Sequence, residues 1–102
     1  ENIEFIQGKT EEILGNLKIK ADVLILDPPR AGCHIDTLNA IIDNPPKKII
    51  YVSCDPKTLM RDIDLLSKSQ FKLVSIDPID MFPQTHHVEC VATMLQINMK
   101  KQ

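Results

Sequence analysis

Cys54 is the residue best placed in this sequence to act as a nucleophile. It follows the apolar run Lys48–Val52, which is typical of a buried strand, and it precedes Pro56–Leu59, which is typical of a helix start. Asp55 is expected to be the N-cap of that helix and Pro56 its first residue. The unpaired backbone N–H groups and the positive end of the helix dipole then favour a thiolate at Cys54. A thiolate at this position can attack an electrophilic carbon atom.

Two carboxylates, those of Asp27 and Glu89, complete a set of groups that suits addition to a ring. A Cys without a His partner at its side is unusual for hydrolysis, where a Cys–His pair is expected. The set suits conjugate addition, in which a thiolate adds to carbon 6 of a uracil and carbon 5 then takes an electrophile. A base removes the carbon 5 proton so that the Cys can leave, which makes Cys54 the nucleophile and Glu89 the proton acceptor. Asp27, beside the rigid Pro28–Pro29, is expected to orient the base or the donor.

The elements that must position these residues alternate in the order typical of an α/β fold. Apolar runs predict strands at Ile3–Gln7, Val23–Leu26, Lys48–Val52, Phe71–Ile79 and Val88–Ile97. Capping residues and apolar residues at helical spacing predict helices that begin at Thr10, Ile35 and Pro56. Residues 80–87 join the last two strands and are too few for a crossover helix, so these strands are expected to be antiparallel.

This topology predicts that the three chemical groups meet at one edge of the sheet. Parallel strands joined by right-handed crossovers end at the same edge, where open α/β sheets bind ligands, so Asp27 and Cys54 are expected there. If the last strand runs the opposite way, it begins on that edge with His87–Glu89. A thiol and two carboxylates that are far apart in the sequence are therefore expected on one rim.

The composition sets limits on the kind of protein. With 102 residues, 43% of them hydrophobic and 25% charged, the chain forms at most one globular domain. A net charge of −2 argues against this segment as the main electrostatic contact to a nucleic acid. Three Cys without framework spacing fit free thiols in a reducing compartment, so a cytoplasmic location is predicted. No apolar stretch approaches membrane-spanning length.

Three segments resemble the RNA (uracil-5-)-methyltransferases, which act on 23S ribosomal RNA or transfer RNA. They are Asp27–Gly32 (DPPRAG), Ile49–Cys54 (IIYVSC) and Ile79–Glu89 (IDMFPQTHHVE), in this order and across nearly the whole chain. The resemblance implies S-adenosylmethionine as the methyl donor and RNA as the partner, with 23S ribosomal RNA favoured over transfer RNA. It also implies Cys54 as the covalent nucleophile, Glu89 as the base, and Asp27 in the motif that lines the donor and uracil pocket.

The resemblance implies a class I (Rossmann-like) methyltransferase fold, with a mostly parallel sheet and an antiparallel final strand. Residues 1–102 are expected to be the C-terminal portion of such a catalytic domain, inactive when isolated, because the family's glycine-rich donor loop and RNA-binding domain are absent. Two strands that separate Ile3–Gln7 from the Asp27 strand in the family are absent too. The first strand is therefore expected either to close this gap or to leave an edge that self-associates. Asp55 stands where the family usually has Asn, and its charge is expected to oppose thiolate formation.

Other interpretations of these residues remain open. The chain could be a folded fragment that neither binds donor nor turns over, or part of an enzyme that methylates an exocyclic amino group. The second needs an aromatic residue at position 30, where Arg30 stands, and no nucleophilic Cys. A zinc site built from Cys33, His34, the pair His86–His87 and Cys90 lacks ligand spacing, so no metal is predicted. Cys90 is expected to face the core.

Overall fold

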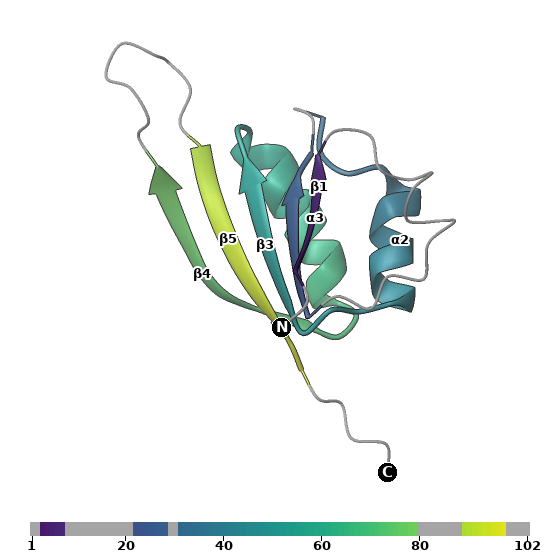
Figure 1. Cartoon of the computed structure of the whole chain (residues 1–102). Helices are drawn as coiled ribbons and strands as arrows, with labels where there is room; N and C mark the ends of the chain where they lie inside the picture. Colours follow the sequence, from purple (N-terminus) through teal and green to yellow (C-terminus); the bar gives the residue numbers. More distant parts are fainter. Residues whose placement is uncertain (1–2, 8–21, 29–30, 80–88, 98–102) are drawn as a thin grey trace.

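The computed structural model describes residues 3–7, 22–28, 31–79 and 89–97. Within these ranges the chain forms the elements β1 Ile3–Gln7, β2 Val23–Asp27, α2 Ile35–Asp43, β3 Lys48–Ser53, α3 Pro56–Ser67, β4 Phe71–Ile79 and β5 Glu89–Gln96 (Figure 1). Each of these elements was predicted: the strand bounds agree with the prediction to within one residue, and α2 and α3 begin at the predicted residues. The helix expected to begin at Thr10 lies outside the described residues.

The strands form one mixed sheet in the order β1-β2-β3-β5-β4. β1, β2 and β3 are parallel, and β5 is antiparallel to both of its neighbours, β3 and β4. The predicted mostly parallel sheet with an antiparallel final strand is therefore confirmed. β1 pairs directly with β2, with Ile3 opposite Val23 and Gln7 opposite Asp27, which is the gap-closing arrangement of the two that the sequence left open.

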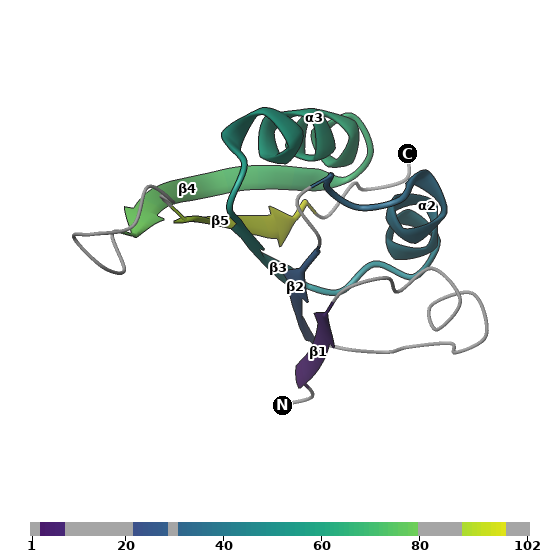
Figure 2. The same ribbon diagram turned by 90° about the horizontal axis from the view of Figure 1, so that it is seen from above.

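Both described helices cover the same face of the sheet (Figure 2). Apolar residues recur at helical spacing on α2 and α3, and buried and partly buried residues alternate along β3, so these elements turn one side to a shared core. The most deeply buried side chains of this core include Leu26, Leu38, Ile41, Ile49, Tyr51, Leu59, Ile63, Leu66, Phe71 and Met94. No helix in the described part of the chain is long and apolar enough to cross a lipid bilayer.

Both helices begin at a residue whose side chain caps the first turn. Asp55 accepts a hydrogen bond from the Lys57 amide at 3.0 Å, with Pro56 as the first residue of α3. The N-cap predicted for this helix is thus confirmed. His34 plays the same part for α2, where its Nδ1 accepts from the Asp36 amide at 3.0 Å.

Candidate active site

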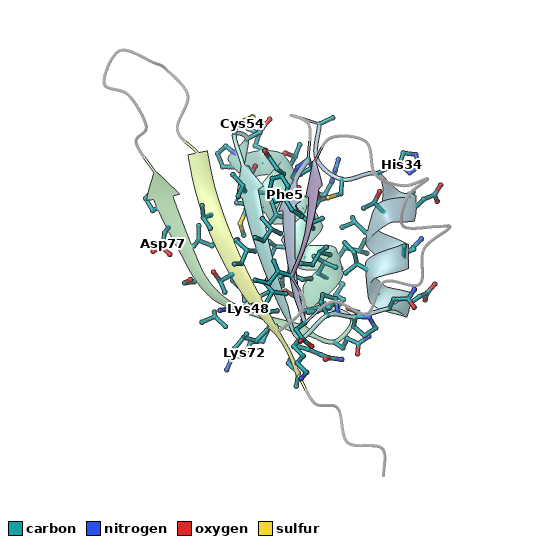
Figure 3. The ribbon with its side chains drawn as sticks, viewed as in Figure 1. Phe5, His34, Lys48, Cys54, Lys72 and Asp77 are labelled. Carbon is teal, nitrogen blue, oxygen red and sulfur yellow. The ribbon has the colours of Figure 1, made fainter. Side chains whose placement is uncertain are left out.

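Asp27, Cys54 and Glu89 belong to three neighbouring strands that meet at one edge of the sheet. β2 ends at Asp27, β3 ends at Ser53 immediately before Cys54, and β5 begins at Glu89. Leu26 lies opposite Tyr51, and Ser53 lies opposite Cys90, so the strand ends are level with one another. Figure 3 shows Cys54 at this edge, beyond the end of β3. The backbone thus brings the three positions to the edge at which the sequence places them.

The turn that carries Cys54 is closed by its two neighbours in the chain. The Ser53 hydroxyl accepts from the Asp55 amide at 3.0 Å and donates to the Asp55 carbonyl at 2.9 Å. The same carbonyl accepts from the Thr58 hydroxyl at 3.2 Å and from the Leu59 amide at 3.0 Å. Cys54 therefore sits between two residues whose positions are held by the start of α3, and its thiol is free and partly exposed.

The segment after β2 is held by hydrogen bonds to residues in the middle of α3. Asp27 is partly buried at the end of β2. The Cys33 amide donates to Asp62 Oδ2 at 2.8 Å, and Arg61 Nη2 donates to the Ala31 carbonyl at 3.0 Å. Two adjacent residues of α3 thus hold the chain a few residues beyond Asp27.

Asp62 is the residue of this region that the sequence analysis missed. Its side chain is fully buried, and its carboxylate accepts hydrogen bonds from the Tyr51 hydroxyl, the Cys33 amide and the Arg61 guanidinium. A signal was available, because Asp62 lies on the same helix face as Leu59 and Leu66. An acid on an apolar helix face is buried only when it is paired.

The other two thiols are poorly suited to nucleophilic chemistry. Burial, together with the Asp62 charge, raises the pKa of Cys33 to about 12. Burial, with Cys33 and Asp62 as neighbours, also raises the Tyr51 pKa far above its usual range. Cys90 is partly buried and packs against the core, as predicted. Of the three cysteines, Cys54 alone combines partial exposure with a helix N-terminus.

The residues once considered as zinc ligands have other contacts. The Cys33 thiol is buried beside Asp62 and Tyr51, and His34 caps α2. Across the residues that the structure describes, no three His, Cys, Asp or Glu side chains are grouped so that they could hold a metal ion. His86 and His87 lie outside those residues.

Comparison with known proteins identifies the family. The family model described as tRNA (Uracil-5-)-methyltransferase matches residues 9–97. An uncharacterized RNA methyltransferase of Oceanobacillus iheyensis is 46% identical over 91% of this chain, and one of Clostridium tetani is 44% identical over all of it. The matches cover 21% and 23% of those relatives, so the chain spans about a fifth of their length.

Solved structures agree with this assignment. The Pyrococcus abyssi tRNA (uracil-54, C5)-methyltransferase, crystallised with S-adenosyl-L-homocysteine, is 41% identical with a TM-score of 0.66, over 74% of this chain and 18% of that one. A putative RNA methyltransferase of Pyrococcus horikoshii has a TM-score of 0.63 at 10% identity, over 86% of this chain and 48% of that one, and shows the fold alone. The described elements are therefore part of a class I methyltransferase fold, and the chain belongs to the tRNA (uracil-5-)-methyltransferase family.

Proposed function

We propose that the full-length protein containing this chain transfers a methyl group from S-adenosylmethionine to carbon 5 of a uridine in RNA. The observation that carries the proposal is the meeting of Asp27, Cys54 and Glu89 at one sheet edge, in a chain that belongs to this family. The 102 residues would form the C-terminal portion of the catalytic domain. The cytoplasm is the proposed location, which the three free cysteines favour.

In the proposed reaction Cys54 acts first. Its Sγ bonds to carbon 6 of the uracil, and the electron pair released to carbon 5 bonds to the incoming methyl carbon. S-adenosylmethionine, when bound, would supply that methyl group from its sulfonium, whose sulfur would keep the electron pair of the broken S–CH3 bond and leave as the neutral thioether. Glu89 then takes the proton from carbon 5, the electron pair of that C–H bond forms the ring double bond again, and the bond between carbon 6 and Sγ breaks.

The donor set at this edge fits a cationic methyl donor. S-adenosylmethionine carries a sulfonium and an ammonium group, and Asp27 places a partly exposed carboxylate at the carboxyl end of a parallel strand. We propose that Asp27 helps to hold the donor or the uracil. The Ser53–Asp55 hydrogen bonds would hold Cys54 in place, so that little rearrangement is needed when the uracil arrives.

A mechanism-based trap tests the two catalytic roles in the full-length protein. An RNA that carries 5-fluorouridine has no proton at carbon 5 for a base to remove, so the wild-type enzyme should accumulate a covalent protein–RNA adduct with it. Cys54→Ala should give no adduct and no methylation. With unmodified RNA, Glu89→Gln should form the adduct and release it slowly, because the nucleophile acts before the base.

The control for this test is Cys90→Ala, which removes a thiol from a core-facing position near the same edge. It should retain both trapping and turnover. Trapping by Cys54→Ala, or normal turnover without accumulated adduct in Glu89→Gln, would count against the assigned roles.

Ribosomal RNA is the proposed substrate, and transfer RNA is the alternative. The full-length protein would be incubated with S-adenosylmethionine bearing a labelled methyl group and with each RNA prepared from cells lacking its gene. Methylated uridine in 23S ribosomal RNA supports the proposal. Methylation confined to transfer RNA would show that transfer RNA is the substrate. The proposed reaction steps would still stand.

The isolated 102-residue chain offers a separate test of its own donor binding. The family's glycine-rich donor loop is absent from its sequence, so titration calorimetry should detect no binding at millimolar S-adenosylmethionine. Saturable binding tighter than about 100 μM, worth roughly 5.5 kcal/mol, would show that the donor site does not need that loop.

A further inference from the structure

The Asp62 carboxylate accepts hydrogen bonds from three different parts of the structure. Asp62 Oδ2 accepts from the Cys33 amide and the Tyr51 hydroxyl, and Oδ1 accepts from Arg61 Nε and Nη2, both at 3.1 Å. The side chain is fully buried, so these bonds replace the water that the charge has lost. Such a group cannot shift without breaking several bonds at once.

These bonds link the two segments that carry the proposed chemistry. Tyr51 lies on β3 three residues before Cys54, and Cys33 follows the Asp27 strand. Asp62 lies seven residues after the N-cap Asp55, which is two helical turns, or roughly 10 Å, along α3 and on the same helix face. One rigid helix therefore flanks Cys54 at its start and anchors the Asp27 segment two turns later.

Gly32 shows how closely this segment lies against the helix. It is buried with a φ of +91°, a conformation that favours glycine. A Cβ atom at this position would lie 2.6 Å from Arg61 Nη2, 2.9 Å from Asp62 Oδ2 and 3.2 Å from Thr58 Cβ. A methyl group could therefore fit between the segment and α3 only if these side chains shifted.

We propose that Asp62 is a positioning residue for the uracil methylation proposed above, on which this inference rests. Its side chain is fully buried, so it would act without touching substrate or donor. It acts through the Cys33 amide and the Tyr51 hydroxyl, and it sets the place of the Asp27 segment relative to Cys54. A displacement of about 1 Å in the reacting groups can lower the rate a hundredfold. The hydrogen bonds to Asp62 should therefore affect the rate of the chemical step.

The test uses the full-length protein and the pair Asp62→Asn and Asp64→Asn. An Asn at position 62 keeps one oxygen that can accept from the Cys33 amide and loses the charge that holds Arg61. Asp64 lies on the same helix, exposed, with a surface pair to Lys68 at 3.1 Å. Single-turnover methyl transfer at saturating donor and RNA should fall at least tenfold in Asp62→Asn, and KM should rise for the substrate that Asp27 helps to hold. Asp64→Asn should match the wild type in both.

A second measurement tests whether Asp62 holds this segment, and it does not require an active enzyme. Hydrogen exchange at the Cys33 amide should be at least tenfold faster in Asp62→Ala, which removes the acceptor of that amide, than in Asp64→Ala. Unchanged exchange would show that Asp62 does not hold this segment and would overturn the inference. A folded Asp62→Asn protein that melts at a lower temperature but turns over at the wild-type rate would overturn it too, since Asp62 would then be structural only.

Failure of the proposed function would give a different experimental result from failure of this inference. A wild-type protein that methylates no uridine in RNA removes the reaction, and with it the positioning role, whatever the exchange data show. If Asp62→Asn does not fold, Tyr51→Phe takes its place, because it removes one donor to the carboxylate and keeps the ring. A two- to tenfold lower single-turnover rate at saturating donor and RNA supports the inference, and a wild-type rate overturns it.

Discussion

The turn at Cys54 and the segment Ala31–Cys33 both lie against α3, yet they are held in different ways. Hydrogen bonds between residues two and three positions apart, among Ser53, Asp55 and Thr58, hold the turn. Bonds from Arg61 and Asp62, 30 and 29 positions away, hold the segment. Local bonds can form as soon as the helix starts, whereas the segment is placed only when the whole core has assembled. The turn should therefore tolerate changes elsewhere, and the segment should depend on one buried carboxylate.

The largest expected effect is that of Asp62→Ala on the stability of the 102-residue chain. Removal of the carboxylate leaves the Cys33 amide and the Tyr51 hydroxyl without their buried acceptor, which should lower the free energy of unfolding by about 3 kcal/mol. Urea unfolding measures this loss. Asp64→Ala on the same helix should cost under about 0.5 kcal/mol, because its carboxylate is exposed. Equal costs for the two variants would remove the contrast between the two regions.

The thiols of the two regions, Cys54 in the turn and Cys33 in the segment, should also differ strongly in reactivity. Burial holds the pKa of Cys33 near 12, so at pH 8 about one molecule in ten thousand carries its thiolate. Cys54 is partly exposed at a helix N-terminus. Under limiting iodoacetamide at pH 8, with mass spectrometry to map the sites, Cys54 should be labelled at least about a hundredfold faster than Cys33. Earlier labelling of Cys33 or Cys90 would contradict the assignment of Cys54 as the reactive thiol.

Gly32→Ala should have the next largest effect, about 2 kcal/mol in the free energy of unfolding. The alanine would have to adopt a φ of +91° and approach Asp62 and Thr58 closely. Thermal or urea unfolding of the same chain measures the cost. The cost has two causes, the steric contact with Arg61 Nη2 and the backbone conformation at position 32. A double-mutant cycle with Arg61→Ala separates them, because Arg61→Ala removes the 2.6 Å contact and leaves the backbone conformation unchanged. A cost below about 0.5 kcal/mol in Gly32→Ala would mean that the segment moves freely.

The smallest effect in the series belongs to the local turn. Asp55→Ala removes the side chain that caps α3 and should cost about 1 kcal/mol. Asp55→Asn is the matched control, because Asn caps as well as Asp and should be nearly neutral in urea unfolding. A cost above about 3 kcal/mol for Asp55→Ala would place the turn among the regions that depend on the whole structure.

Much of the edge that carries the candidate site could be predicted, because its determinants are local or topological. The apolar run of β3, the cap at Asp55 and Pro56 define where the strand ends and the helix begins, and with them the place of Cys54. The short connection between β4 and β5 predicted their antiparallel pairing, which puts Glu89 at the same edge as Cys54. These features depend on chain direction and local hydrogen bonding, which sequence patterns report directly.

Other features could be decided only by packing between distant residues. The cap supplied by His34 has no strong sequence preference behind it. The place of β1 was left between two arrangements, and its parallel pairing with β2 depends on which strand edge is open.

The sequence by itself determined the order of the elements, the strand directions and hence the edge at which Asp27, Cys54 and Glu89 meet. Tertiary structure decided what holds the Asp27 segment there. A carboxylate on an apolar helix face becomes stable only when donors arrive from Tyr51 and Cys33, 11 and 29 residues away. Hydrophobic periodicity records which face of a helix is buried, whereas a buried charge is stabilised by partners whose positions exist only in the folded chain.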